Sequence, residues 1–383
     1  MKIKNIEKAA ERIRQAAASK ESIIIYGDSD MDGIASVVIL DEAIKNIGGN
    51  VVASVFPDRE KDGYGVNMKA LDFLKDKAPA LFITLDLGIG NIKEIKKANE
   101  LGFEVIVVDH HQPLDSLPEA SIIVDPQQAG DEAGFKYLCN AGLTYKLVEE
   151  ILKDEFSENL RTSFLELVAL ATISDMVPQI GDNKLYIEKG LKSLPKTFRP
   201  GLQSFLDIIG EGYVAAGGFM KIISALNASE SINFENESYK LLTSSSYEEC
   251  KDITERLIGK VRLKQEIIKN IVAEVEKRVN KNPEEIVFEG DPAWRLVLAG
   301  PVASIISQEF KKPTFIFKKE SDESCGSVRL FSDSQNSVEA MKTCSDILIT
   351  YGGHPKASGF RVKTKDLEEF KHRLIAYFMK HKT

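Results

Sequence analysis

Three aspartates stand at every second position, directly after a β-branched run near the N-terminus. The stretch IIIYGDSDMDG, residues 23–33, contains Asp28, Asp30 and Asp32. Neighbouring carboxylates repel one another, and their burial is costly unless a positive charge compensates them. A bound metal ion supplies such a charge, so this spacing predicts a metal site.

Similar residue types occur at three other places in the first half of the chain. Asp86 follows the apolar run LFITL, and Asp109, His110 and His111 follow VIVV. Asp175 comes after the apolar helical stretch VALATIS. Carboxylates with imidazole suit Mn²⁺, Mg²⁺, Fe²⁺ or Zn²⁺, and an oxygen-rich set favours Mn²⁺ or Mg²⁺. So many aspartates exceed the needs of one ion. Two ions that share a bridging carboxylate would use them, and such a pair holds a phosphoryl group and activates water.

Each of these motifs also has a purely structural interpretation. DxDxDG is the pattern of a calcium loop or of a capped turn, although Ile39 stands where an EF-hand loop needs a glutamate. DHH could be a helix cap with solvated histidines, and an isolated Asp175 is more often a cap than a ligand. Their shared position at the ends of strands or of a helix favours one common site.

Short β-branched runs alternate with helical patterns in the first half of the chain, which predicts a parallel sheet with helices on both faces. In such sheets ligands bind at the carboxyl ends of the strands. Residues 139–195 are helical in pattern, and the charged, apolar-periodic run from Tyr247 to Val279 predicts one long helix. Strands are expected again from about residue 285, in EIVFEG, WRLVLAG, PTFIFKK and SCGSVRLF.

These patterns predict an α/β protein with two lobes, an N-terminal parallel-sheet lobe and a smaller C-terminal α/β lobe. A long helix would join them, and the active site would lie in the cleft between them. We expect the first lobe at 1–195, a helical connector at 196–283 and the second lobe at 284–383.

Composition narrows the class of protein. The 383 residues suit two or three domains, and 43% apolar residues suffice for their cores. A net charge of −8 argues against holding long nucleic acid by bulk charge alone. The four cysteines form no CxxC pair, so neither a zinc site nor a disulfide framework is indicated. Without a membrane-length apolar run or a signal-peptide pattern, we expect a cytoplasmic protein.

Longer motifs identify a family resemblance. In order along residues 23–360 the chain contains IYGDSDMDGIAS, LDLGIGN, VVDHHQP, IVDPQQ, LCNAGLTYKL, ATISDMVPQIGDN, AGPVAS, GSVR and YGGHPKASGF. With these segments it resembles the DHH phosphoesterase superfamily, and within it the RecJ-like single-strand exonucleases. The resemblance implies a DHH domain, a DHH-associated substrate-binding domain and a phosphodiesterase with two divalent ions, Mn²⁺ before Mg²⁺. It favours 5′→3′ hydrolysis of single-stranded DNA.

The resemblance also implies the metal ligands. The expected catalytic and metal-binding residues all come from the four motifs above: Asp28, Asp30, Asp32, Asp86, His110, His111 and Asp175. Asp30 and Asp86 would hold one ion, with Asp28 close by. Asp86 would also bridge to a second ion, whose other ligands would be Asp32, His110 and Asp175.

Further residues would act on the substrate. His111 would face its phosphate, and Asp109 would orient a histidine from behind the ligands. The substrate-binding residues expected in the second lobe come from GSVR and YGGH: Ser327, Arg329, Gly352, Gly353 and His354. An arginine fork and an imidazole suit a terminal phosphate.

The chain departs from the RecJ-like pattern in three respects. Ala225 and Ser231 stand where the segment PRxNAxGR carries arginines, and Arg295 stands where a histidine is common. We also expect no additional OB-fold. Fewer cationic contacts weaken the grip on long single strands.

Two alternative functions therefore stay open beside the exonuclease. One is a phosphodiesterase for short oligonucleotides or cyclic dinucleotides, which the same centre would serve. The other is a catalytically inactive scaffold of a replication complex, although such proteins lose metal ligands that are present here. The expected partners are single-stranded nucleic acid or a short oligonucleotide and, in addition, a replication or repair protein. No membrane partner is expected.

Overall fold

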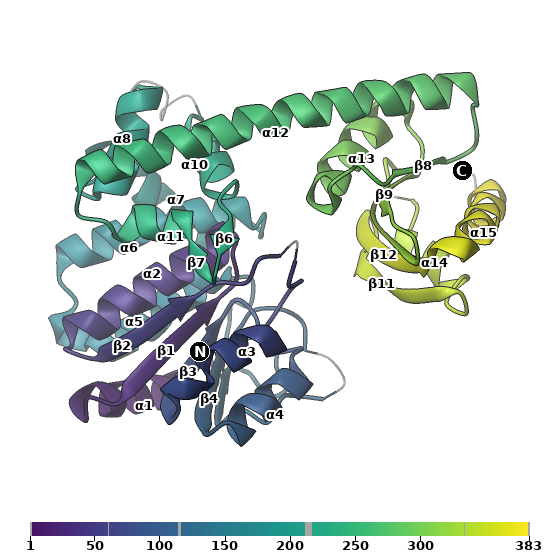
Figure 1. Cartoon of the computed structure of the whole chain (residues 1–383). Coiled ribbons are helices and arrows are strands. Elements are labelled where there is room, and N and C mark those ends of the chain that lie inside the picture. Colours follow the sequence, from purple (N-terminus) through teal and green to yellow (C-terminus); the bar gives the residue numbers. More distant parts are fainter. Residues whose placement is uncertain (1, 60, 114–115, 211–216, 333, 382–383) are drawn as a thin grey trace. The chain divides into compact units, whose positions relative to one another are not determined.

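The computed structural model describes residues 2–59, 61–113, 116–210, 217–332 and 334–381 (Figure 1). They form two compact units, Met1–Val261 and Arg262–Thr383. The expected α/β class, with a parallel sheet and a second sheet, is confirmed. The expected boundaries at residues 195 and 283 stay predictions.

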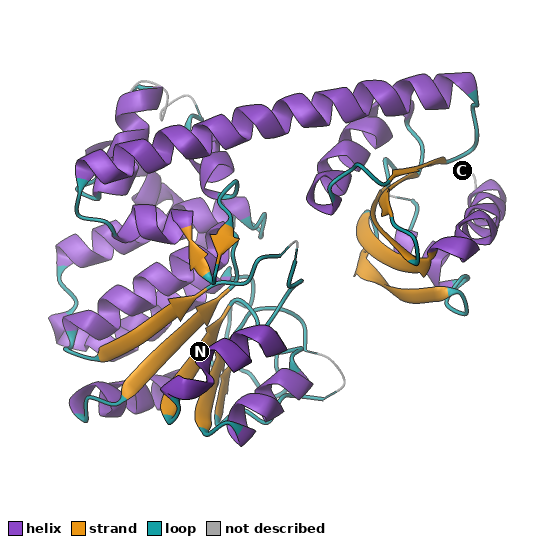
Figure 2. Cartoon of the chain, viewed as in Figure 1, coloured by secondary structure: helices purple, strands orange, loops and turns teal. Residues whose placement is uncertain are grey.

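A parallel sheet forms the centre of the first unit (Figure 2). Among the described residues its strands stand in the order β2-β1-β3-β4-β5. Their bounds are β1 (Ser22–Gly27), β2 (Asn50–Val55), β3 (Ala80–Leu85), β4 (Phe103–Val108) and β5 (Ile122–Val124). A short antiparallel pair, β6 (Ser231–Ile232) and β7 (Glu235–Asn236), contacts β2 through β7.

Helices cover both faces of this sheet, which explains why the central strands β1, β3 and β4 are apolar at most positions. In β1, Ile23 and Ile25 enter one core, whereas Ile24 and Tyr26 enter the other, because successive side chains of a strand point to opposite faces. The helices are α1 (Ile6–Ala18), α2 (Met31–Asn46), α3 (Met68–Leu74), α4 (Ile92–Glu100), α5 (Asn140–Leu152), α6 (Glu158–Ser174), α7 (Gly181–Ser193), α8 (Pro200–Ile209), α10 (Phe219–Leu226), α11 (Glu237–Thr243) and α12 (Tyr247–Lys281). Residues of α3 and α4 line the second core, and α1, α2, α5 and α6 line the first.

The expected long helix is α12, a continuous helix of 35 residues that begins at Tyr247. Its first part packs into the first unit through Ile253 and Leu257. Its last part packs into the second unit through Ile271 and Val275.

The second unit is built on a sheet in which only β8 and β9 run parallel among the described strands. The strand order is β11-β12-β10-β9-β8. The bounds are β8 (Val287–Asp291), β9 (Thr314–Lys319), β10 (Glu323–Arg329), β11 (Leu348–His354) and β12 (Ala357–Lys363), with helices α13 (Leu296–Phe310), α14 (Ser337–Lys342) and α15 (Leu367–Lys380). One face packs with α14 and α15, and α13 packs on the other.

The prediction of a strand in WRLVLAG is wrong, because helix α13 begins within this segment, at Leu296. A short apolar run does not distinguish a strand from a buried helix by periodicity. In the structure the buried side chains recur at helical spacing, with Leu298, Val302 and Ile306 on one face.

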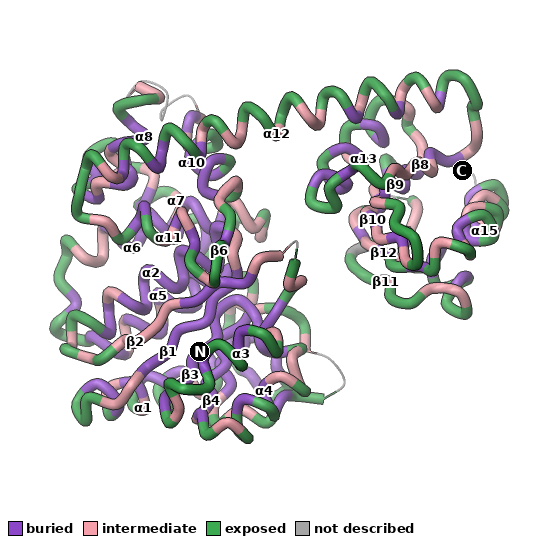
Figure 3. Tube along the Cα trace, in the orientation of Figure 1, coloured by how far each residue is buried: buried purple, intermediate pink, exposed green. Residues whose placement is uncertain are grey.

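The burial pattern agrees with these layers, since β1, β3 and β4 are buried at the centre of the first unit (Figure 3). No helix in the described parts of the chain is long and apolar enough to cross a bilayer.

Candidate metal centre

The turn after β1 gives each of its aspartates a different partner. Asp30 caps α2, since its Oδ1 accepts the N–H groups of Asp32 (3.1 Å) and Gly33 (3.0 Å). A Cβ on Gly33 would lie 2.4 Å from the carbonyl oxygen of Asp28, so glycine is required for the turn to close. The alternating aspartates and the glycine therefore define one tight strand-to-helix turn.

The start of α5 holds the carboxylate of Asp32, which is 1% exposed. Its Oδ2 accepts the backbone N–H of Asn140 (2.6 Å), and its Oδ1 accepts that of Ala141 (2.8 Å). The first N–H groups of a helix lack intrahelical acceptors, and the helix dipole favours an anion there. Asp32 is therefore fixed by backbone groups of a segment far along the chain.

Asp86 follows β3 in the left-handed backbone region, with φ 65°. This region is sparsely populated by residues with a side chain, so surrounding contacts must hold it. The residue is 3% exposed. Its Oδ1 lies 3.1 Å from Nε2 of His110 and has no hydrogen-bond partner among the described residues.

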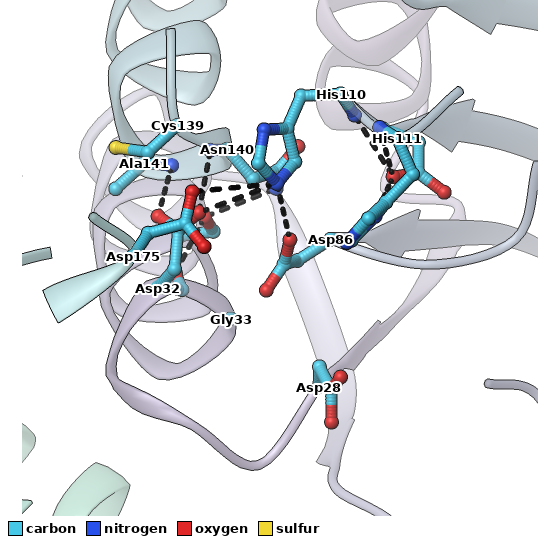
Figure 4. A network of polar contacts seen from close by, with 12 residues as sticks. Asp28, Asp32, Gly33, Asp86, His110, His111, Cys139, Asn140, Ala141 and Asp175 are labelled. Atoms are coloured by element: carbon cyan, nitrogen blue, oxygen red, sulfur yellow. Dashed lines mark hydrogen bonds and ion pairs between the residues drawn. The ribbon is translucent and has the colours of Figure 1, made fainter. Parts of the chain in front are cut away.

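The ring of His110 points into this group of carboxylates (Figure 4). Its Nδ1 lies 3.1 Å from the carbonyl oxygen of Leu138, which accepts only, so we assign the proton to Nδ1. Its Nε2 faces carboxylate oxygens of Asp86 (3.1 Å), Asp32 (3.8 Å) and Asp175 (3.8 Å). A lone pair that faces carboxylates needs a cation between them, either a proton or a metal ion.

Asp175 joins this group from the C-terminal end of α6. It is the C-cap residue of α6, and its backbone N–H donates to the carbonyl oxygen of Ala171 (2.9 Å). Met176 then takes a left-handed conformation, φ 58°, which turns the chain away from the helix axis. Asp175 therefore reaches the cluster from a helix, whereas the other aspartates follow strands.

The expected ligand atoms gather in sets whose members all lie within 4.8 Å of one another. The sets are Asp28, Asp30 and Asp86; Asp32, His110 and Asp175; and Asp86, His110 and His111. Asp86 belongs to the first set and also lies next to the histidine of the second. All seven residues expected as catalytic or metal-binding thus lie together, and their roles as ligands stay predictions.

Without a metal ion this cluster takes up protons. Burial, and then repulsion from Asp32, raises the pKa of Asp86 well above its ordinary value. The same two causes raise the pKa of Asp175 to about 7. For His110, burial lowers the pKa but the facing carboxylates raise it, with a net rise. Divalent ions would replace these protons. Oδ1 of Asp86 and Nε2 of His110, which have no hydrogen-bond partner among the described residues, therefore fit a metal centre together with the surrounding carboxylates.

Arg59 is a site residue that the sequence interpretation missed. Its Nε and Nη2 donate to the two oxygens of Asp28 (2.8 and 2.6 Å), and Nη2 also donates to Asp30 (2.8 Å). The guanidinium lies over the ring of Tyr64, 4.8 Å from its centroid. Arg59 follows β2, a strand whose end lies at the same edge of the sheet, and this position was the available signal.

The second histidine has a different environment. Asp109 is 1% exposed, and its Oδ1 lies 2.8 Å from Nδ1 of His111 and also accepts the N–H of His110 (2.8 Å). Its Oδ2 accepts the N–H of Ile89 (3.0 Å). The bond to Asp109 raises the pKa of His111 to about 9. In the metal-free protein this favours the protonated form of His111, whose side chain is 57% exposed.

A further contact ties two parts of the cluster together. Oδ1 of Asn227 accepts the N–H of Met31 (2.8 Å), and its Nδ2 donates to Oγ of Ser174 (2.8 Å). Met31 lies between two aspartates of the turn, and Ser174 precedes Asp175. Asn227 is one of the two residues of the PRxNAxGR segment that this chain retains, and its contact role was not predicted.

The positions of the missing arginines are buried in this chain. Ala225 is 1% exposed and packs in the first core, and Ser231 is 5% exposed. Oγ of Ser231 accepts a hydrogen bond from Nδ2 of Asn236 (3.2 Å). Neither position therefore offers a charge to a ligand.

The expected substrate residues of the second unit lie on strands that flank β12. Arg329 of β10 and the backbone of His354 of β11 both stand opposite Ala357, and Ser327 and Gly352 both stand opposite Gly359. The side chain of His354 lies outside the described part of the structure. The adjacent Gly353, φ 125°, is paired with Ser358.

Arg329 is half-buried, and no carboxylate among the described residues pairs with it. Its Nη1 donates to the carbonyl oxygen of Val328 (2.9 Å), and burial lowers its pKa. Gly300 of α13 leaves room for it, since a Cβ there would lie 3.1 Å from Nη2 and 3.6 Å from Oγ of Ser327. An uncompensated guanidinium beside a hydroxyl is an anion-binding arrangement.

Comparison with known proteins agrees with this geometry. Residues 22–172 match the DHH family, N-terminal domain. The chain is 32% identical to the single-stranded-DNA-specific exonuclease RecJ of Bacillus subtilis, over 97% of this chain and 47% of that protein. It is 27% identical to the RecJ of Salmonella typhimurium, over 97% of this chain and 68% of that protein. The chain thus spans about half the length of the first relative.

A solved structure is similar over nearly all of both chains. The crystal structure of exonuclease RecJ bound to manganese superimposes with a TM-score of 0.82 and 25% identity, covering 99% of this chain and 96% of that one. Fold, motif order and sequence identity lead to the same assignment. Residues 22–172 carry the DHH family's N-terminal domain, and along nearly its whole length the chain is similar in sequence and fold to RecJ-like members of the DHH superfamily.

Proposed function

We propose that this protein is a metal-dependent phosphodiesterase that hydrolyses single-stranded DNA from an end. The observation that carries the proposal is the gathering of carboxylates and His110 around Asp86, at the strand ends where a parallel sheet binds ligands. The names of the relatives, and the manganese in the similar solved structure, support the same activity.

The proposed ligands fall into two groups that share one residue. Asp30 and Asp86, with Asp28 nearby, would hold one divalent ion, and Asp32, His110 and Asp175, again with Asp86, would hold the other. Bound ions of this kind activate water and stabilise charge on phosphate oxygens. Mn²⁺ is favoured and Mg²⁺ is the alternative.

The protein's own residues would bind and orient the phosphate. The bond to Asp109 raises the pKa of His111 to about 9 in the metal-free protein, and the ring is partly exposed, so in its protonated form it can donate a hydrogen bond to a phosphate oxygen. Asp109 fixes the ring through Nδ1 and leaves Nε2 for the substrate. A cation held in this way costs little reorganisation when the charge on the phosphate grows.

The second unit would bind the strand itself. Residues 262–383 contain 21 lysines and arginines against 17 aspartates and glutamates, so this unit is basic within an acidic chain. Arg329, with Ser327, would bind a phosphate, and Gly352, Gly353 and His354 would line the same face. Phosphate contacts give affinity without reading sequence.

From the family resemblance we propose that hydrolysis proceeds in the 5′→3′ direction. We also propose a low affinity for long strands, because Ala225 and Ser231 are uncharged and buried. A replication or repair protein that supplies additional strand binding, and a cytoplasmic location, belong to the same proposal. Neither is needed for the chemistry.

A substrate panel with Mn²⁺ tests the proposal. Purified protein would be incubated with single-stranded DNA of about 40 nucleotides, a length of several OB-fold site sizes. The DNA would be labelled at the 5′ or the 3′ end, and matched RNA and a dinucleotide would be assayed in parallel. Stepwise loss of the 5′ label from DNA is expected. Cleavage of the dinucleotide alone would move the protein to short substrates, and no cleavage with metal bound would contradict the proposal.

A further inference from the structure

Asn140 is a fully buried polar residue at the junction of the elements that carry the metal cluster. It is the first residue of α5 and is 0% exposed. It lies in the motif LCNAGLTYKL, to which the sequence interpretation gave no role. Its backbone N–H binds Asp32, as described above (Figure 4). Its side chain makes contacts of its own.

Both the oxygen and the nitrogen of the carboxamide find hydrogen-bond partners in one orientation only. In that orientation its oxygen accepts from the N–H of Asp86 (2.8 Å) and from Oγ of Ser36 (3.0 Å), and its nitrogen donates to the carbonyl oxygen of Val108 (3.0 Å). In the opposite orientation the nitrogen reaches only Oγ of Ser36 (3.0 Å). Hydrogen-bonding partners decide the orientation of an amide, and they favour the first.

These contacts join three elements at the cluster. Asp86 follows β3, and Val108 ends β4 directly before the DHH motif. Ser36 lies in α2, where its single hydroxyl proton is shared between the carboxamide oxygen (3.0 Å) and the carbonyl oxygen of Asp32 (2.8 Å). The carboxamide of Asn140 therefore lies behind ligands from three separate segments.

The contact with Asp86 matters most, because its backbone is left-handed. The N–H of Asp86 also bonds to the carbonyl oxygen of Val108 (3.1 Å), so it is shared between two acceptors. A strained backbone persists where surrounding groups over-determine it. Without the carboxamide, one bond would hold the peptide that aims the shared carboxylate.

We infer that Asn140 is a positioning residue that sets the direction of the Asp86 carboxylate toward both metal positions and the register of β3 against β4 and α2. The inference rests on the proposed function only in assigning metal ions to the cluster. The hydrogen-bonded junction itself is a property of the described structure. Residues behind metal ligands typically change metal affinity about 10–100-fold when replaced.

The test compares Asn140→Ala with Asn236→Ala in the full chain. Asn236 is a matched control, since it is 2% exposed and caps α11 through the N–H groups of Ser238 and Tyr239 without touching the cluster. Mn²⁺ affinity would be measured by titration calorimetry, the melting temperature by circular dichroism, and the exchange of the Asp86 amide by NMR.

Asn140→Ala should weaken Mn²⁺ binding about 10–100-fold and speed exchange of the Asp86 amide, whereas Asn236→Ala should lower only the melting temperature. Unchanged Mn²⁺ affinity and amide exchange in Asn140→Ala would overturn the inference. If Asn140→Ala does not fold, Ser36→Ala removes one partner of the carboxamide, and it should weaken Mn²⁺ binding in the same direction. An unchanged affinity there would then overturn the inference.

None of these measurements uses a nucleic acid. Wild-type protein that binds Mn²⁺ but cleaves no strand would refute the proposed function and leave this test valid. In Asn140→Ala with substrate, a lower kcat at unchanged KM is expected, because the residue does not touch the strand.

Discussion

The metal-free protein should lose stability as the pH rises from 5 to 8, because Asp175 is forced to ionise in the buried cluster. Its pKa is raised to about 7 by burial and by Asp32, whereas an unfolded aspartate titrates near 3.9. A raised folded-state pKa contributes stability that is complete below the unfolded pKa and is lost as the pH passes through the folded one. The window of loss is therefore about pH 4 to 7.

The expected size follows from the part of this window above pH 5. Two pKa units correspond to about 2.7 kcal/mol of unfolding free energy. The Asp175 side chain is 26% exposed and interacts with Asp32, so we expect roughly half of this, about 1–2 kcal/mol. For a unit of this size that corresponds to a fall in melting temperature of about 2–8 °C.

Thermal unfolding in EDTA at pH 5, 6, 7 and 8 measures this effect. Asp175→Asn is the control, because it keeps the shape and removes the titrating group, so only the difference between the two profiles counts. Trp294, the single tryptophan, lies in the second unit, so its fluorescence provides an internal reference. Parallel profiles for wild type and Asp175→Asn would refute the reasoning.

Three further predictions concern the ligands and the substrate contacts. Asp86→Asn should reduce hydrolysis below detection, since it removes the carboxylate shared by both ions; full turnover would contradict the shared role. Arg59→Leu should increase the rise in melting temperature produced by Mn²⁺, because Asp28 and Asp30 lose their resident cation; an unchanged or smaller rise would show that Arg59 does not compete with metal. Arg329→Ala should raise KM about tenfold or more, as a lost charge-assisted bond implies, with Mn²⁺ affinity unchanged; a parallel loss of Mn²⁺ affinity would argue against a role in strand binding.

The residues of the cluster could be located from the sequence because of a general property of parallel sheets. The carboxyl ends of neighbouring parallel strands meet at one edge, so Asp28, Asp86 and Asp109 had to lie near one another once their strands were recognised. The apolar stretch before Asp175 likewise indicated a helix that ends at this residue.

The partners that hold these residues could not be predicted in the same way. Asn227 contacts Met31 across 196 positions, and Asn140 contacts Asp32 across 108. Such contacts depend on how helices dock on the sheet, which periodicity does not encode. Arg59 was closer, 31 positions from Asp28. Its position after β2 indicated the right edge of the sheet, but not which carboxylates it would bind.

Local ambiguity explains the wrong strand at WRLVLAG. The segment is short and apolar, and its helical nature becomes visible only when Val302 and Ile306 are counted on the same face as Leu298. Tertiary packing against β9 and β10 decided the outcome.

The central claim, a centre of two ions that share Asp86, is tested most directly by counting bound Mn²⁺ by electron paramagnetic resonance while hydrolysis of single-stranded DNA is followed in the same titration. We predict two ions per chain, hydrolysis that appears only as the second ion binds, and loss of both in Asp86→Asn. Full hydrolysis with a single bound ion, or two ions bound with unchanged affinity in Asp86→Asn, would contradict it.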